Sequence, residues 1–196
     1  KFITIEEFND ITDYCVNAQD AVILALLFEG VKGEEYEEIL NLKVDDCNFD
    51  TNELKLTKNN GEERNITVSE RTMSIIQDAI NEREYFKNNG EMSENLKSYK
   101  YKITVTDHVV RISNLKNDDK IKPCNIFSRI NKIKKFWGNP YITPTSIWYS
   151  GMLNMAKNIK NEKGELNKED YIEINNRFGF NELYWHKTKS RLVDFL

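Results

Sequence analysis

The sequence predicts an α+β fold that is mainly helical and includes a small antiparallel sheet. Residues 21–28 form a wholly apolar run, which is typical of a helix that is buried on all sides. Residues 53–68 contain two stretches of alternating apolar and polar residues, and the Asn60-Gly61 pair between them is a strong hairpin signal. Elsewhere most apolar residues recur at helical spacing.

Three helices are expected before the hairpin. Thr4 and Glu7 have the spacing of a capping box, so the first helix is predicted to begin there. The apolar helix follows at about 20–28, and it is too short to span a bilayer, which requires about 20 apolar residues. It is therefore expected at the centre of the core. An amphipathic helix is predicted at about 34–42.

The segment after the hairpin is predicted to be a helix followed by a less regular stretch. Ser69 has the position of an N-cap, and the helix is expected to end near residues 88–90. Residues 99–105 then alternate like a strand, with residues 109–112 as the expected partner strand. Residues 117–119 (NDD) are predicted to form a turn.

Four helices are predicted in the last part of the chain. The first spans about 123–137, with Phe127 expected on its inner face and Arg129 on its basic outer face. The second begins after the cap Thr143, with a proline at its first position. The third is expected at about 168–178, and the last begins near Asn181.

The composition suits one domain of ordinary globular character. The chain has 196 residues, and residues 91–120 are the best candidate for an insertion or an excursion from that domain. The net charge is −4, from 28 basic and 32 acidic side chains. This balance neither indicates nor excludes nucleic-acid binding, because local clustering of charge matters more than the sum. The first residue is Lys1, which leaves open whether an N-terminal DNA-binding domain precedes the chain.

The cysteines and histidines indicate no metal site. The three cysteines are far apart and form no CxxC pair, so we expect them to be reduced and the protein to be cytoplasmic. His108 and His186 lack ligand spacing to any cysteine. No signal peptide or membrane-spanning run is present in the sequence. We therefore expect no metal, no cofactor and no membrane partner.

Two stretches around the buried helix carry a resemblance to a known family. Residues 26–32 (LLFEGVK) resemble the LLxxTGLR stretch of tyrosine recombinases, the phage integrase family. Residues 38–43 (EILNLK), with Asp46 and Phe49, resemble the SE-ALNLKWxDIDF continuation of the same family. Each motif is short, so the resemblance depends on their order along the chain.

Two later stretches extend this resemblance. Residues 66–69 (ITVS) resemble the strand R-x-VPL of the family, and residues 142–148 (ITPTSIW) resemble its ITPHDLR box. The resemblance covers roughly residues 4–185 and implies the fold of an integrase catalytic domain. In that family a tyrosine attacks DNA while two arginines, one or two histidines and a hairpin lysine surround the phosphate. Such charge stabilisation is what phosphoryl transfer requires.

The family's arginine positions hold other residues in this sequence. The first arginine falls on Lys32 if Gly30 is the anchor, and on Glu35 if the downstream stretch is the anchor. Neither side chain provides the bidentate guanidinium that suits a phosphate. The box that reads H-x-x-R in the family has Thr145 in place of the histidine and Trp148 in place of the arginine.

The remaining reactive positions also differ, except for the lysine. The family's LGH box resembles residues 178–180 (FGF), so Phe180 replaces the histidine. The tyrosine nucleophile is expected near Lys189, and no tyrosine lies there. Lys58, near the hairpin tip, has the position of the family's lysine. These departures together indicate that the scaffold is kept and the cutting reaction is lost.

The leading hypothesis is therefore a non-catalytic protein that binds double-stranded operator DNA. It resembles phage lytic-cycle repressors with an integrase fold, to which residues 30–35 (GVKGEE) are similar. Basic side chains would contact phosphates, which gives position and affinity but little sequence specificity. The expected DNA-binding residues are Lys32, Lys58, Arg64, Lys132, Lys134, Lys135, Thr145, Ser146, Tyr149, Lys187, Lys189 and Arg191.

Two other hypotheses stay open. The first is an active recombinase with an unusual site, which would use Tyr149, Tyr171 or Tyr184 as its nucleophile. The second is an interaction module without a DNA role, which the acidic balance favours modestly. The lysine-rich face at 132–135 would then be an ordinary solvated surface, and Lys58 and Arg64 would balance Glu62 and Glu63.

The apolar C-terminal tail has two interpretations. It packs on a neighbouring protomer, as the C-terminal segment often does in tyrosine recombinases, or it folds back on its own core. The tail consists of Leu192, Val193, Phe195 and Leu196.

Overall fold

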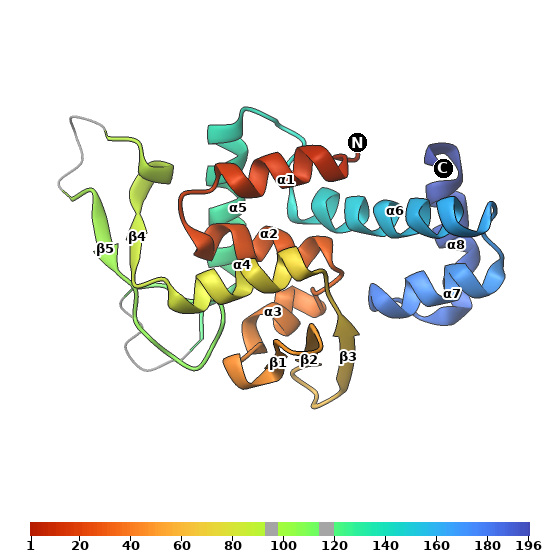
Figure 1. Ribbon diagram of the computed structural model, residues 1–196, viewed down its shortest axis with the longest axis horizontal. Coiled ribbons are helices and arrows are strands. Elements are labelled where there is room, and N and C mark those ends of the chain that lie inside the picture. Colours follow the sequence, from red (N-terminus) through yellow and green to blue (C-terminus); the bar gives the residue numbers. More distant parts are fainter. Residues whose placement is uncertain (93–97, 114–119) are drawn as a thin grey trace.

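The buried helix α2 (Ala18–Phe28) lies near the centre of the fold, with several other helices around it (Figure 1). A computed structural model describes residues 1–92, 98–113 and 120–196 of the chain. Every side chain from Ala21 to Phe28 is buried, as the apolar run predicts. The helices in contact with α2 include α1 (Ile5–Tyr14), α4 (Glu70–Asn81), α5 (Pro123–Trp137) and α6 (Pro144–Lys163).

Helices α2 and α6 touch at the level of their backbones. Gly151 of α6 lies so close to α2 that an added Cβ atom would be 1.7 Å from the carbonyl oxygen of Phe28. Only glycine permits such an approach, so this residue fixes how α6 crosses the central helix. The contact also joins the N-terminal part of the core to the helices that follow.

The small antiparallel sheet is present where the sequence predicts it. Its strands are β1 (Cys47–Asn48), β2 (Glu53–Thr57) and β3 (Glu63–Thr67), in the order β1-β2-β3. Leu54 of β2 pairs with Ile66 of β3, and both side chains are buried. The alternation in the sequence thus places the apolar face of the hairpin on the core.

Three predicted helix caps are confirmed. The hydroxyl of Thr4 accepts a hydrogen bond from the backbone N–H of Glu7 at 3.1 Å. Ser69 caps α4 in the same way, and Thr143 caps α6. Each cap satisfies an N–H group that has no partner inside the helix.

The helix predicted at 34–42 is shorter and begins with a kink. The structure has a 3₁₀ turn η1 (Glu34–Tyr36), then α3 (Glu37–Asn41) and a second turn η2 (Val44–Asp46). Glu35 and Tyr36 have φ angles of 47° and 65°, in the left-handed region. The buried carboxylates of the next residues stabilise this path, because Glu37 and Glu38 accept bonds from the backbone N–H groups of Glu34 and Lys32.

The helix predicted to end near residues 88–90 instead ends at Asn81. The following residues form β4 (Glu84–Phe86) and a turn η3 (Lys87–Gly90). Bonds to the start of α2 determine this path, since Glu82 accepts from the N–H groups of Ala18 and Gln19. Asn17 also pairs through its side-chain amide with the N–H and C=O groups of Phe86.

The strand pair predicted for residues 99–105 and 109–112 does not form, although the N–H of Thr104 donates to the carbonyl oxygen of Ile112 at 3.1 Å. Strand β5 (Lys100–Lys102) pairs with β4 rather than with residues 109–112. Val109 and Val110 are instead buried in the main core. The turn predicted at residues 117–119 lies outside the described residues.

Helix α5 has the predicted bounds, but two of its side chains lie on the opposite face from the one expected. Phe127 is 53% exposed, whereas Arg129 is only 4% exposed. The guanidinium of Arg129 lies 3.5 Å from the buried carboxylate of Asp20 and donates to the carbonyl oxygens of Gln19 and Arg111. These buried acceptors outweigh the apolar preference of Phe127 for the interior.

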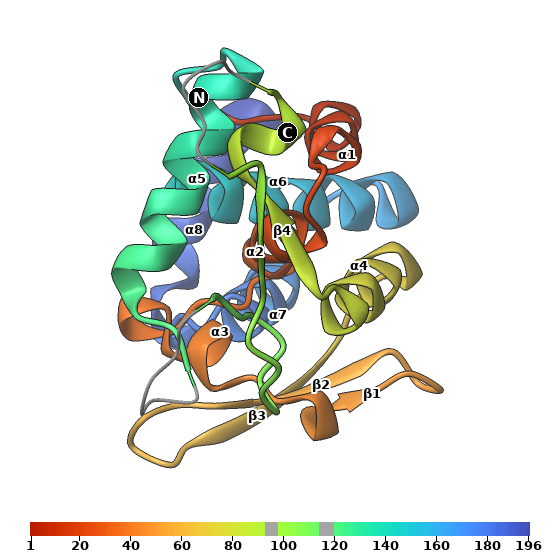
Figure 2. The ribbon, with the colours of Figure 1, turned by 90° about the vertical axis from the view of Figure 1, so that its left-hand side faces the viewer.

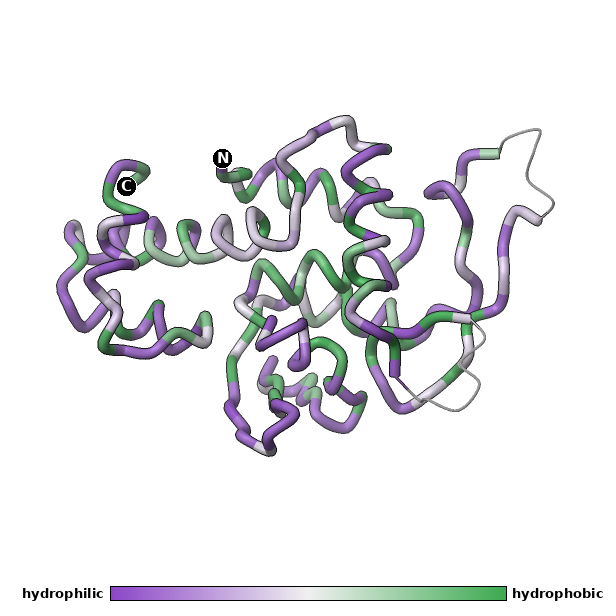
Figure 3. Tube along the Cα trace, turned by 180° about the vertical axis from the view of Figure 1, so that it is seen from behind, coloured by the Kyte–Doolittle hydropathy of each residue, from purple (hydrophilic) through white to green (hydrophobic). Residues whose placement is uncertain are grey.

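The C-terminal helices enclose a second apolar cluster. They are α7 (Lys168–Arg177), a turn η4 (Glu182–Tyr184), α8 (Trp185–Leu192) and a final turn η5 (Val193–Phe195). The cluster includes Met152 of α6, Ile174 of α7 and Leu192 of α8. Figure 3 shows the most continuous apolar stretch in the central helix, away from these ends. Among the described residues, no helix is long and apolar enough to cross a membrane.

Candidate nucleic-acid interface

Four elements that carry residues predicted to contact DNA lie toward one face of the molecule. The hairpin tip between β2 and β3, α3 with the turn before it, α5 and α8 are all on the left in Figure 2. The same face is toward the viewer in Figure 3. The elements to which the sequence assigns DNA contacts therefore border a common surface, with the turn after α2 near its middle.

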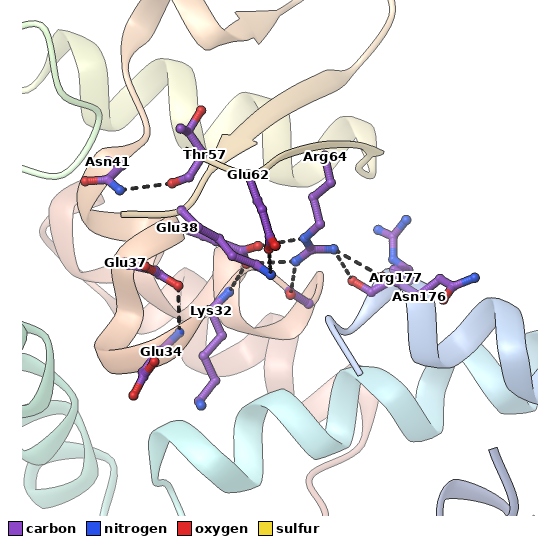
Figure 4. Close-up of polar contacts among 12 residues, drawn as sticks. Lys32, Glu34, Glu37, Glu38, Asn41, Thr57, Glu62, Arg64, Asn176 and Arg177 are labelled. Atoms are coloured by element: carbon purple, nitrogen blue, oxygen red, sulfur yellow. Dashed lines mark hydrogen bonds and ion pairs between the residues drawn. The ribbon is translucent and has the colours of Figure 1, made fainter. Parts of the chain in front are cut away.

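Lys32 lies in this turn and extends toward α6 (Figure 4). Its ammonium is 5.2 Å from the ring centroid of Trp148 and 5.9 Å from that of Tyr36. Cations at such distances are attracted to the ring face. The fold thus brings together two positions that the resemblance assigns to catalytic arginines, and here they hold a lysine and a buried tryptophan.

Arg64 of β3 is the most heavily bonded side chain beside this turn (Figure 4). Its Nε donates to Oε1 of Glu38 at 2.6 Å, and its Nη2 donates to Oε2 of the same carboxylate at 2.8 Å. Nη2 also donates to the carbonyl oxygen of Gly30 at 3.0 Å, and Nη1 to that of Arg177 at 2.6 Å. We call these four residues the Arg64 clamp.

In the clamp, the guanidinium of Arg64 binds acceptors of the protein itself. The side chain of Glu38 is 1% exposed and that of Arg64 is 20% exposed, so the carboxylate is almost fully withdrawn from water. A buried carboxylate requires a charged partner and hydrogen bonds. The phosphate contact predicted for Arg64 stays a prediction, and it would compete with these bonds.

A second arginine connects α7 to the same region. Arg177 donates to Oε2 of Glu29 at 2.5 Å and to the carbonyl oxygen of Thr67 at 2.8 Å. The other oxygen of Glu29 accepts from Ser69 and Thr72. The end of α7 is therefore held on the hairpin and on α2 by ion pairs and carbonyl contacts.

The hairpin tip pairs its own charges. Lys58 Nζ lies 2.7 Å from Oε2 of Glu62, and this bond raises the pKa of the lysine and lowers the pKa of the glutamate. The expected balance between Lys58 and Glu62 is confirmed. Glu63, however, pairs with Lys55 at 2.8 Å rather than with Arg64.

Ser146, one of the predicted DNA contacts, takes part in capping the start of α6. Ser146 accepts from the N–H of Thr143 at 2.9 Å and donates to the carbonyl oxygen of Tyr141. Thr145 is exposed. Tyr149 accepts a hydrogen bond from the guanidinium of Arg191, which also lies 4.4 Å from its ring centroid. Two predicted contacts from distant parts of the sequence are therefore adjacent.

The other basic candidates are on the surface. Lys132 and Lys135 of α5 are exposed and Lys134 is half-buried, and none of the three forms an ion pair with a described residue. Lys187 lies 4.3 Å from the ring centroid of Tyr184, and Lys189 is exposed.

Aromatic rings fill the part of the site where the resemblance places a histidine. Trp148 lies 4.9 Å from Phe180 and 5.8 Å from Phe178, measured between ring centroids. Of the tyrosines considered as nucleophiles, Tyr171 is buried, and desolvation raises the pKa of its phenol. Tyr184 is 49% exposed. No group of three or more metal-ligating His, Cys, Asp or Glu side chains gathers in the described parts of the chain.

The C-terminal tail is partly folded onto its own core. Leu192 is fully buried, and the ring of Phe195 lies 4.6 Å from that of Phe2. Lys160 donates to the backbone oxygen of Leu196 at 2.6 Å. Val193 and Phe195 are still about half exposed. Packing of the tail on a neighbouring protomer stays a prediction. Val193 and Phe195 are the side chains that would make this contact.

Comparisons with known proteins agree with the fold. The family model described as MrpR, C-terminal catalytic domain, matches residues 2–196. The SPbeta prophage-derived uncharacterized protein YopR of Bacillus subtilis (strain 168) is 28% identical over 200 residues. This match covers all of the chain and 61% of YopR, so the chain spans less than two thirds of that relative.

Solved recombinase structures are similar in fold. A crystal structure of XerA recombinase has a TM-score of 0.61 at 13% identity, covering 97% of this chain and 64% of that one. XerH recombinase bound to difH substrate has a TM-score of 0.59 at 11% identity, covering 96% and 49%. The Tn1549 transposon integrase with a circular intermediate DNA has a TM-score of 0.59 at 12% identity, covering 96% and 60%. The chain belongs to the family of the MrpR C-terminal catalytic domain, and it has the fold of the tyrosine recombinases.

Proposed function

We propose that this chain binds double-stranded operator DNA without cutting it, as part of a phage or prophage transcriptional repressor in the cytoplasm. The fold supports a DNA partner, because similar structures include XerH bound to difH substrate and the Tn1549 integrase with a circular intermediate DNA. The prophage origin of YopR supports the biological setting. Fold alone does not establish function, so the proposal depends on the site.

The Arg64 clamp is the observation that carries the proposal. A cutting site needs fork-shaped cations aimed at the scissile phosphate. Beside the turn after α2, the guanidinium of Arg64 is bound by Glu38 and by the carbonyl oxygens of Gly30 and Arg177. A phosphate at this place would meet a cation whose charge a buried carboxylate already balances, so strong charge stabilisation of a transition state is not expected.

The groups around the clamp are suited to holding DNA. Lys32 lies against Trp148, and Lys132, Lys135 and Lys189 are exposed to solvent. Lysine ammonium groups are point charges that bind phosphates without a fixed geometry. The resulting affinity would be strongly dependent on salt, with a slope of about −0.9 per phosphate contact in a log–log plot.

One observation favours the alternative of an active recombinase. The hydroxyl of Tyr149 accepts a hydrogen bond from Arg191, so a tyrosine that could attack a phosphate lies beside a guanidinium that could bind one. Tyr149 is half-buried beside Trp148, at 5.1 Å between ring centroids. A repressor would use the same pair to contact the DNA backbone, so the two functions differ in whether a covalent bond forms.

Two measurements on the chain test the proposal. In a gel-shift titration against fragments of the phage genome, we expect binding at low salt that weakens steeply as salt is raised. With a nicked suicide DNA substrate, we expect no covalent protein–DNA adduct. An adduct that disappears in Tyr149→Phe would establish the recombinase alternative. If the chain gave no shift at low salt, the proposed DNA binding would be refuted.

A further inference from the structure

A groove of about 810 Å³ lies on the surface between α1, the start of α2 and α4. Figure 2 shows α1 and α4 on the right, whereas α5 and α8, which carry residues proposed to contact DNA, are on the left. One wall of the groove is a single face of α4, because its lining residues recur at helical spacing from Arg71 to Glu82. At about 1.5 Å per residue, this wall is about 16 Å long.

Small and apolar side chains line much of the groove. Cys15, Ala18 and Ile75 pack against the main core but are only partly buried. Val16 also lines the groove and is 51% exposed. Ser74, on the α4 wall, is exposed. Small side chains let a second helix approach closely, and the apolar ones give it a surface to cover, so the groove has the form that binds the apolar face of a helix.

The charged groups that line the groove are mainly acidic. They are Asp13, Asp78 and Glu82, together with Arg71, which pairs with Asp13 at 2.6 Å. Neither Asp78 nor Glu82 forms an ion pair with a described residue. Burial raises the pKa of Glu82, and the backbone N–H groups at the start of α2 offset this effect only in part.

Two helix ends add to the negative potential of the groove. Helix α1 ends at Tyr14 and α4 at Asn81, and neither helix has a basic residue in its last turn. The C-terminus of a helix carries a partial negative charge, which basic side chains stabilise. Asp78 and Glu82 are also one turn apart, and like charges at this spacing repel each other. A cation that enters the groove would therefore be attracted by carboxylates without an ion-pair partner among the described residues.

We propose that this groove binds a short amphipathic helix of a partner protein, with apolar residues on one face and lysines or arginines flanking that face. Asp78 would pair with a cation of the helix, and Val16 and Ile75 would contact its apolar face. The length of the α4 wall corresponds to about three helical turns. This inference concerns the chain alone and does not depend on the proposed DNA function.

The test uses a designed probe, the peptide acetyl-KLKQALQQLAQKLK-amide, whose leucines share one helical face with lysines on both sides of it. Binding to the full chain at physiological salt is followed by calorimetry and by amide NMR shifts. We expect a dissociation constant of about 100 µM or tighter, as for a small transient interface, with the largest shifts in α1 and α4. The matched peptide with glutamate in place of lysine should bind at least about tenfold more weakly.

Two variants on α4 locate the site. Asp78→Asn removes an exposed carboxylate and should weaken binding of the lysine peptide about threefold, as expected for a surface ion pair. Ser74→Tyr places a ring in the groove from an exposed position and should weaken binding at least about tenfold. The matched controls are Glu70→Gln and Gln77→Tyr, which change exposed residues of α4 outside the groove lining and should leave the affinity unchanged.

Several results would overturn the proposal. They are no binding of the lysine peptide at 1 mM (about tenfold above the expected dissociation constant), equal binding of the two peptides, and a Ser74→Tyr effect no larger than that of Gln77→Tyr. A second copy of the chain is the other occupant to test. If the chain alone self-associates in sedimentation velocity and Ser74→Tyr abolishes the association, the groove is an interface between copies and the partner helix is refuted.

Discussion

Four arginines of this protein and the three lysines of α5 occupy different places. Arg64, Arg111, Arg129 and Arg177 are buried or half-buried, and each donates to at least one backbone carbonyl oxygen. The lysines of α5 are on the surface, without an ion pair to a described residue. The inner cations connect elements that are distant in sequence, and the outer ones are free to meet another molecule.

This difference follows from the chemistry of the two cations. A guanidinium offers five N–H donors in a planar fork and is only weakly hydrated, so it can serve several buried acceptors at once. An ammonium is strongly hydrated and is costly to bury. These four arginines thus stabilise the fold, and most of the residues proposed to contact DNA are lysines, which give affinity with little sequence specificity.

The largest effect is expected from removing an inner arginine. Arg129→Met would leave the carboxylate of Asp20 buried without its cation, and the carbonyl oxygen of Gln19 without its donor. Breaking a buried ion pair from one side costs about 3–5 kcal/mol. Urea unfolding at pH 7, followed by tryptophan fluorescence, measures this loss in the free energy of unfolding.

The matched control for this change is Lys132→Met, one turn further along α5. Lys132 is exposed, so its replacement should change the free energy of unfolding by no more than about 0.5 kcal/mol. If the two variants had similar free energies of unfolding, the inner arginine would contribute no more to stability than the outer lysine, which would contradict the comparison. A partial recovery in the double variant Asp20→Asn, Arg129→Met would identify the unpaired carboxylate as the cause.

The next largest effect is expected at the clamp. Arg64→Lys keeps the charge but loses the fork that bonds Glu38 and the carbonyl oxygens of Gly30 and Arg177. We expect a loss of about 2–3 kcal/mol, because at least two bonds of a charged group are removed. The control Lys58→Met breaks an exposed pair with Glu62 and should cost no more than about 1 kcal/mol. An equal cost at both positions would contradict a structural role for the fork.

The sequence predicted the elements whose signals are local. The apolar run of α2, the Asn60-Gly61 hairpin and the caps Thr4 and Ser69 each depend on residues that are close together in the chain. The predictions were wrong where contacts with residues distant in sequence determine the end of a helix or strand. Helix α4 stops at Asn81 because Glu82 bonds the start of α2, more than 60 residues away, and a local pattern contains no sign of that bond.

The candidate site was predicted only in part for the same reason. The resemblance identified the turn after α2 and the start of α6, which the fold places together. It did not reveal the Arg64 clamp, because Arg64 lies 26 residues from Glu38 and 113 from Arg177. The outer lysines were identified by charge alone, and Arg129 was wrongly grouped with them because helical spacing cannot distinguish a buried cation from an exposed one.

The outer lysines should affect DNA binding rather than stability. Replacing Lys132, Lys134 and Lys135 of α5 together with glutamine would remove up to three phosphate contacts. We expect the slope of log affinity against log salt to become shallower by about 2–3, with affinity at low salt at least about tenfold weaker. Gel shifts at several salt concentrations measure the slope, and the free energy of unfolding should stay unchanged. An unaltered slope would place the DNA elsewhere.

Replacing Lys163 is expected to have the smallest effect on stability. It tests the comparison directly, because this lysine, like the inner arginines, is paired with a buried group. Its ammonium lies 2.5 Å from the carboxylate of Asp170, whose side chain is 2% exposed. The carboxylate also accepts from the N–H of Asn167 at the start of α7. The bond from Lys163 is the main cause that lowers the pKa of Asp170 below its ordinary value of 3.8.

A carboxyl group with a lowered pKa in the folded state stabilises the protein above the pKa of the unfolded chain. That stability is lost as the pH falls through the folded-state value. Lys163→Met removes the main cause, so it should lower the free energy of unfolding at pH 6. The difference from the unaltered protein should shrink as the pH falls below 3.8 and Asp170 is protonated in both. Urea unfolding between pH 6 and pH 3 measures it. A difference that stays constant with pH would mean that Lys163 acts through packing and not by pairing with the carboxylate of Asp170.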